Sequence, residues 1–289
     1  MIFIAVLAAV LAILSPLWGL IFTLSFSGKY LNRFYLFMLL FVLAIVGLFL
    51  ANVVDWITFF DVFIGIAVSI FIYFYIMQKS GSYINAILAA SAVNCCYAIA
   101  RQFIWGKQLL ENVILAMQNV ESFMQSSITE NQEQLSFALE LIESTKAILT
   151  KYYIGTWMVS IILGLYFGSL LLSRQLQNKW DHRRIGLPFY IIYLLIASLL
   201  LFILPQVRIL GINSLMILVP LFIIQGVSIL DFFWRDFFTK SKFLLFLLIF
   251  SMALNIPILI LVALVGMLDI WFDFRKIRVM EENDENHSS

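Results

Sequence analysis

Charged residues are scarce in this sequence. Asp, Glu, Lys and Arg make up 12% of its 289 residues, while hydrophobic residues make up 63%. A soluble domain carries about 25% charged residues. Lys plus Arg number 18 and Asp plus Glu number 17, so the net charge of +1 provides no extended field for nucleic acid or for an acidic substrate. The composition excludes a nucleic-acid-binding protein and predicts one whose main solvent is a lipid bilayer.

Cysteine and histidine are almost absent. Cys95 and Cys96 are adjacent within an apolar stretch, and neighbouring residues make a poor disulfide or metal framework. His182 and His287 lie in polar segments, and no Walker A loop, zincin helix, nucleophile elbow or glycine-rich dinucleotide turn occurs. No cluster of His, Asp or Glu marks an active site at a membrane boundary. We therefore expect no catalysis, no metal site and no cofactor.

Long apolar runs dominate the chain, and a helix needs roughly 20 such residues to cross the hydrocarbon. Continuous runs do not alternate as barrel strands would. The first run lacks a basic start and is too long for a cleavable signal core, so we expect it to stay as a span. The sequence predicts an all-α polytopic membrane protein with about eight transmembrane segments. These runs are 2–26, 34–54, 57–77, 83–105, 152–173, 187–204, 214–234 and 243–268.

The segments divide into a membrane region at 1–105 with four spans, a polar insert at 106–151, a second membrane region at 152–274 with four spans, and a polar tail at 275–289. The short even-numbered loops contribute only Arg208. The positive-inside rule then puts the odd-numbered loops in the cytoplasm and the insert outside. Those odd-numbered loops hold ten basic residues, namely Lys29, Arg33, Lys79, Arg174, Lys179, Arg183, Arg184, Arg235, Lys240 and Lys242.

The tail conflicts with this count, because its basic residues Arg275, Lys276 and Arg278 would lie outside after eight crossings. Asn255 and Pro257 interrupt the last run, and proline lacks the amide that a continuous helix uses. Two alternatives follow: the last segment is a helix broken at Pro257, or it is a short hairpin that returns the tail to the cytoplasm.

The insert at 106–151 carries six glutamates and three lysines, with apolar residues at helical steps of three and four. Thr129 and Gln132 have capping-box spacing for the start of a second helix. We expect an antiparallel amphipathic hairpin, either upright or lying on the bilayer, although its acidity disfavours anionic lipid. Its periodic residues are Leu110, Val113, Met117, Val120 and Met124, then Leu135, Ala138, Ile142, Thr145 and Leu149.

Asp61 and Arg101 are charged residues within spans, where an unpaired charge costs several kcal/mol. They would lie at similar depth on antiparallel neighbouring helices, so an ion pair between them is expected to be geometrically accessible. Ser91 and Asn94 share a helical face with Arg101. One interpretation is a polar ligand site that opens outward. The other is snorkelling charge and interhelical hydrogen bonding without a ligand.

Small residues mark two further positions. Gly164 and Gly168 form a GxxxG pair, which serves either internal packing or dimerisation. Gln225 and Gly226 lie in the middle of a span. A side-chain amide next to a glycine, which has no side chain, suits a helix crossing or a ligand contact. We favour the crossing at Gly226, and keep Gln225 as a candidate ligand contact.

The stretch 266–276 reads GMLDIWFDFRK, and helical spacing would put Asp269, Asp273 and Lys276 on one face. An aromatic belt with basic anchors would explain its Trp271 and Arg275 without any function. Together with QGVSILDFF at 225–233, the stretch resembles the C-terminal half of the YybS-like bacterial membrane proteins, whose function is uncharacterised. The resemblance covers most of 157–278 and implies a multi-pass protein of the bacterial plasma (inner) membrane. Its signature residues are Gly266, Asp269, Asp273 and Arg275.

That family is more remotely similar to the substrate-binding (S) subunits of energy-coupling-factor transporters, which bind a small nutrient near the outer side. The resemblance implies a transport-related subunit that binds a small solute and works with a separate ATPase module. The candidate ligand-binding residues are Asp61, Ser91, Asn94, Arg101 and Gln225. The alternative is a structural or regulatory membrane protein that docks partners through its hairpin and the basic loop at 174–186.

Overall fold

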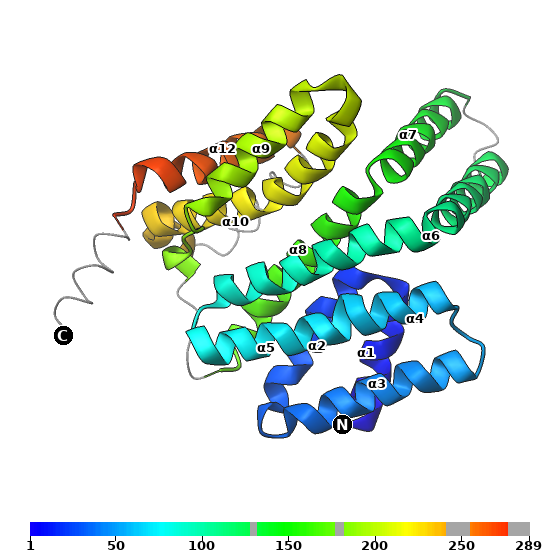
Figure 1. Cartoon of the computed structure of the whole chain (residues 1–289), viewed down its shortest axis with the longest axis horizontal. Coiled ribbons are helices and arrows are strands. Elements are labelled where there is room, and N and C mark those ends of the chain that lie inside the picture. The colour runs from blue at the N-terminus through cyan, green and yellow to red at the C-terminus, as the bar shows by residue number, and fades with distance from the viewer. Residues whose placement is uncertain (128–131, 177–181, 241–254, 277–289) are drawn as a thin grey trace.

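The computed structural model describes residues 1–127, 132–176, 182–240 and 255–276. Within these ranges every regular element is a helix (Figure 1), which confirms the predicted all-α membrane protein. Five helical stretches are long and apolar enough to cross a bilayer: Leu31–Leu50, Trp56–Ser80, Tyr83–Ser127, Tyr153–Ser173 and Pro205–Trp234. Three shorter apolar helices, Ile2–Leu14, Tyr190–Ile203 and Ile256–Phe272, overlap the remaining predicted runs.

The first predicted span is divided in two. Helix α1 (Ile2–Leu14) ends before Ser15, whose backbone is extended, and α2 (Pro16–Lys29) starts at once. Pro16 fits the first position of a helix but has no amide to continue the preceding one. The two helices pack closely at Gly19 of α2. A Cβ on this residue would lie only 2.6 Å from the Ala12 Cα of α1. The run at 2–26 is therefore two short packed helices, and not the single span that we expected.

The N-terminal half continues with α3 (Phe34–Leu50), α4 (Trp56–Val62), the π-helix η2 (Phe63–Val68) and α5 (Ser69–Ser80). Helix α8 (Tyr153–Ser173) packs along α2 through the GxxxG pair. A Cβ on Gly164 would lie 3.0 Å from the Leu20 Cβ, and one on Gly168 would lie 3.0 Å from the Leu24 Cβ. The pair therefore serves packing within the chain.

The start of α4 is held by Asp55, whose Oδ1 accepts a hydrogen bond from the Thr58 amide at 2.9 Å. Removing such a cap typically costs about 1 kcal/mol. We expect Asp55→Ala to lower the free energy of unfolding by about this amount, measured as a shift of the unfolding midpoint in a mixed-micelle denaturant titration. Asp55→Ser retains a capping oxygen and should unfold like the original chain. An equal loss in both variants would argue against the cap.

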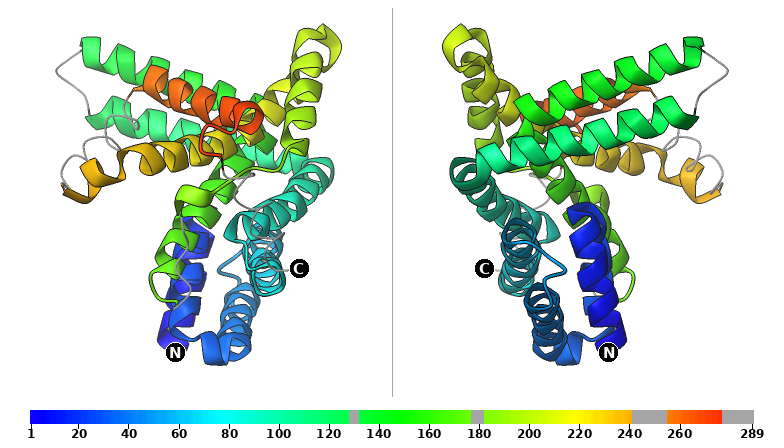
Figure 2. Two further views of the ribbon diagram at one scale, coloured as in Figure 1. Left: turned by 90° about the vertical axis from the view of Figure 1, so that its left-hand side faces the viewer. Right: turned by 90° about the vertical axis from the view of Figure 1, so that its right-hand side faces the viewer.

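Helix α6 (Tyr83–Ser127) runs unbroken for 45 residues, from an apolar segment into the insert. Helix α7 (Gln132–Lys151) returns beside it, which confirms the predicted hairpin. Both arms project away from the N-terminal helices (Figure 2). The turn and Thr129 of the expected capping box lie outside the described residues. No residue of α7 is buried, so the facing sides of the arms close only partly on each other.

The C-terminal half comprises α9 (Tyr190–Ile203), α10 (Arg208–Lys240) and α12 (Ile256–Phe272). Helices α10 and α12 cross with backbones in contact. A Cβ on Gly226 would overlap the Val262 carbonyl oxygen, and one on Gly266 would overlap that of Phe222. Both positions therefore require glycine, and the interpretation of Gly226 as a helix crossing is confirmed.

The end of α12 differs from the sequence expectation. The helix stops at Phe272, and Asp273 takes a left-handed conformation with φ 43°, followed by Lys276 with φ 54°. Asp269, Asp273 and Lys276 therefore do not share a helical face, and that prediction was wrong. At the other end, α12 starts after the non-helical Asn255 with Pro257 in its first turn. Residues 241–254 lie outside the described part, so the broken helix and the short hairpin both stay predictions.

Candidate functional site

Two separate clusters of buried polar side chains stand out. The first, which we call the Arg101 cluster, comprises Asp61 of α4, Tyr97 and Arg101 of α6, and Tyr153 and Trp157 of α8. Arg101 Nη2 forms an ion pair with Asp61 Oδ2, as the sequence suggested. The Tyr97 hydroxyl donates a 2.7 Å hydrogen bond to Asp61 Oδ1. Both carboxylate oxygens are therefore engaged, and the pair is stabilised away from water.

Two aromatic rings of α8, one helical turn apart, cover the guanidinium of Arg101. Its central carbon lies 4.8 Å from the centroid of the Tyr153 ring and 4.5 Å from that of Trp157. A cation over an aromatic face gains electrostatic stabilisation, and the gain grows when the pair is desolvated. The cage explains how Arg101, only 5% exposed, can reside among apolar helices.

Several buried polar atoms around this cluster nevertheless lack a partner. They include Nε and Nη1 of Arg101, the indole Nε1 of Trp157, Oδ1 of Asn94 and Oγ of Ser91. Roughly 90% or more of buried polar groups are satisfied in native proteins, so their concentration on α6 and α8 is informative. Three of them are donors, and the two others can accept.

Asn94 lies on α6 two helical turns before Arg101 and extends the polar region along this helix. Its amide nitrogen donates to the Ala90 carbonyl at 3.2 Å and the Gly65 carbonyl at 3.4 Å, and also contacts Ser69 Oγ. Gly65 belongs to the π-helix η2, and short π-helical segments within α-helices are frequent at functional sites. A Cβ on Gly65 would lie 3.0 Å from the Trp157 ring, so glycine allows this close approach.

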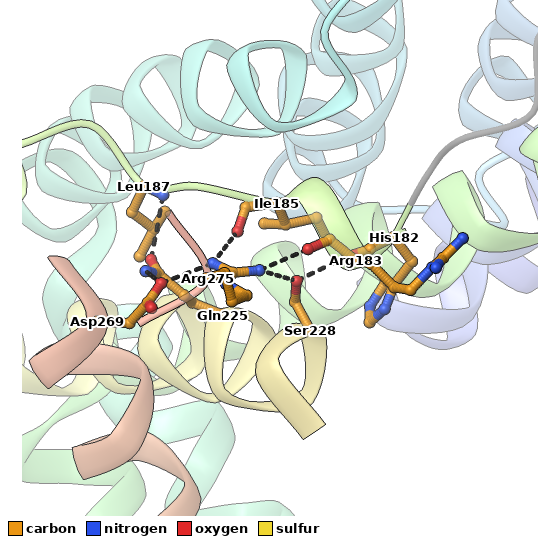
Figure 3. Close-up of polar contacts among 8 residues, drawn as sticks. All are labelled: His182, Arg183, Ile185, Leu187, Gln225, Ser228, Asp269 and Arg275. Carbon is orange, nitrogen blue, oxygen red and sulfur yellow. Dashed lines mark hydrogen bonds and ion pairs between the residues drawn. The ribbon is translucent and has the colours of Figure 1, made fainter. Parts of the chain in front are cut away.

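The second cluster, which we call the Arg275 clasp, ties α10 and α12 to the loop at 182–187 (Figure 3). Arg275 is 3% exposed. Its Nη1 donates to the Arg183 carbonyl at 2.7 Å and Ser228 Oγ at 2.6 Å. Its Nη2 donates to the Ile185 carbonyl and Asp269 Oδ2, both at 2.7 Å. The interpretation of Arg275 as an interface anchor is therefore wrong, because its side chain turns inward.

Gln225 belongs to this clasp and lies apart from the Arg101 cluster. Its Nε2 donates to Asp269 Oδ2 at 2.9 Å, and its Oε1 accepts from the Leu187 amide at 3.1 Å. Both ends of the amide are thus used within the protein. The structure joins Asp269 and Arg275 of the sequence signature in this network and assigns Gly266 to the helix crossing, whereas Asp273 forms the C-cap of α12. The clasp fixes the start of the tail beside the basic loop.

Sequence inspection missed several members of these clusters. His182 Nε2 lies 2.6 Å from the Tyr166 hydroxyl, and its Nδ1 lies 3.4 Å from Asp231 Oδ2, so this loop histidine joins α8 to α10. Ser228 also donates to the His182 carbonyl at 2.7 Å. Spacing offered a signal only for Tyr97, which precedes Arg101 by four residues on the same helix.

A family model described as a predicted membrane protein (DUF2232) matches residues 1–270. No curated protein and no solved structure matches the chain. The family match includes the Arg101 cluster and most of the Arg275 clasp, and ends five residues before Arg275.

Proposed function

The chain belongs to the DUF2232 family of predicted membrane proteins, and we propose that it binds a small polar solute inside the bilayer as part of a transport process. The observation that carries the proposal is the set of unpaired buried donors around Arg101. A solute that accepts hydrogen bonds from them would remove the cost of leaving them unsatisfied. The Asp61 pair and the aromatic cage would hold the guanidinium in place for the solute.

The cluster lies near one end of the apolar part of α6. Trp105 and Lys107 follow Arg101 by one to two helical turns, where α6 passes into the insert. In the proposed orientation the basic loops face the cytoplasm of a bacterial cell, and the hairpin and the solute entrance face outward. The remote similarity to transporter S subunits that the sequence of residues 157–278 suggests would fit such a role. The chain has no nucleotide-binding motif, and the separate ATPase module that the S-subunit resemblance implies would drive turnover.

The test is to purify the protein with its bound small molecules and to identify them by mass spectrometry. We expect a molecule near one equivalent in the original chain and a loss of at least about tenfold in Arg101→Ala, because a charge-assisted hydrogen bond contributes about 1.5–3 kcal/mol. Arg208→Ala is the matched control, since Arg208 is exposed and stacks over Phe202. It should retain the molecule.

Arg101→Ala leaves Asp61 buried without its cation and can destabilise the fold, which would confuse the result. Asp61→Asn with Arg101→Gln removes both charges together, and Arg101→Lys keeps the charge but loses the planar fork. Both variants should fold and bind less solute. If folded variants retain the same molecule as the original chain, or if nothing co-purifies with the original chain, the solute proposal is wrong.

A second function, partner docking through the hairpin and the basic loop, is favoured by the surface of α7. Phe137, Leu141 and Ile148 repeat at helical spacing and are 63%, 52% and 46% exposed. They face away from the side of α7 that meets α6, since Leu135, Ala138 and Ile142 are half-buried on that side. Exposed apolar stripes of this kind are typical of interaction surfaces.

A further inference from the structure

The two arms of the hairpin enclose an open groove with a volume of about 540 Å³. Its apolar lining comes from Met117, Leu139 and Ile142, which are half-buried in the hairpin. The hairpin therefore presents a partly filled apolar seam. A third helix packed along the seam would complete it, because amphipathic helices gain stability mainly by burying such a face.

The rim of this groove is acidic. Glu121 of α6 and Glu140 and Glu143 of α7 line it, opposed by Lys146 alone. All three glutamates are exposed to solvent. An apolar floor with an acidic rim complements a helix that has apolar residues on one face and lysine or arginine on the other.

The negative charge of the rim disfavours three other occupants of the groove: the tail of this chain, a second copy of the hairpin and an anionic lipid surface. The end of the tail, residues 279–289, has no lysine or arginine and carries Glu281, Glu282, Asp284 and Glu285, so it would be repelled by the rim. A hairpin from a second copy carries the same six glutamates and three lysines, and an anionic lipid surface would be repelled as well. We propose that the groove binds a basic amphipathic helix of a partner protein. The inference rests on the docking function and does not depend on solute binding at Arg101.

The test uses the full chain in uncharged detergent and a fluorescent helical peptide of leucine and lysine, whose affinity is read by anisotropy. Glu140→Lys with Glu143→Lys reverses two charges in the groove. Glu111→Lys with Glu133→Lys reverses two exposed charges elsewhere on the hairpin and is the matched control. We expect the first pair to weaken binding by at least about tenfold and the control pair by less than about threefold, because screened charges act mainly on neighbours.

Circular dichroism checks that the variants remain folded. Equal losses in the two variants, or equal binding of a peptide with glutamate in place of lysine, would overturn the proposal in favour of non-specific attraction. Binding that emerges only after removal of residues 277–289 would assign the groove to the tail. Self-association lost in Glu140→Lys with Glu143→Lys, without peptide binding, would assign it to a second copy. If the original chain retains a solute at Arg101 but does not bind the peptide, this inference is wrong while the solute proposal stands. If it binds the peptide but retains no solute, the reverse holds.

Discussion

Replacement of Arg275 by alanine should lower the free energy of unfolding by about 3–5 kcal/mol, the typical cost of removing one partner of a buried ion pair. Asp269, which is 4% exposed, would lose its cation. The carbonyls of Arg183 and Ile185 would lose their donor as well. We expect a lower unfolding midpoint in a mixed-micelle titration.

Limited proteolysis gives a second, local measurement of the same change. Trypsin cleaves after arginine, and Arg183 and Arg184 lie in the loop that the clasp holds. Cleavage there should be several times faster in Arg275→Ala. Lys276→Ala is the matched control, since Lys276 is exposed and adjacent. If Arg275→Ala unfolds and is cleaved like Lys276→Ala, the clasp does not stabilise the C-terminal half.

Gly266→Ala should be nearly as damaging, although it adds a single methyl group. The new Cβ would overlap the Phe222 carbonyl oxygen and lie 2.6 Å from the Gly226 amide nitrogen. Both obstacles are backbone, so no side-chain rotation relieves them and α10 and α12 must move apart. Overpacking of this kind costs about 1–3 kcal/mol or more. The expected result is a lower unfolding midpoint, with a similar effect for Gly226→Ala.

Gly47→Ala provides the control for this prediction. Gly47 lies inside α3, where a Cβ would have no neighbour within 4 Å. Alanine is favoured over glycine in a helix by about 1 kcal/mol, so this variant should be neutral or more stable. A Gly266→Ala protein that unfolds like Gly47→Ala would contradict the close crossing of α10 and α12.

The sequence predicted the helical membrane architecture and the hairpin because hydrophobic length and periodicity are local properties. It also anticipated the Asp61–Arg101 pair, since both charges lay at similar depth in neighbouring segments. It failed at Ser15, where a long apolar run concealed a break that one proline imposes. Apolar composition alone does not distinguish one span from two short helices that pack together.

The inward direction of the Arg275 side chain could not be predicted from the local sequence. An arginine beside exposed aromatic residues is typical of a membrane interface, and Trp271, Phe272 and Phe274 are indeed exposed. The direction of Arg275 depends on the left-handed Asp273 and on carbonyls supplied by a distant loop. Likewise, Tyr153 and Trp157 meet Arg101 only through the packing of α8 against α6. Such long-range contacts are set by tertiary structure and leave no periodic pattern.

The Arg275 clasp also determines which half of the structure can be completed first during translation. Arg275 and Arg183 are separated by 92 positions in the chain, and a ribosome completes the loop long before it reaches the arginine. Helices α1 to α8 carry the Arg101 cluster and can pack before that point. The C-terminal half can form the clasp only once Arg275 has been synthesised and positioned. A nascent chain stopped after residue 270 would contain nearly all of the helices that the structure describes, and it would still lack the side chain that joins the loop at 182–187 to α10 and α12.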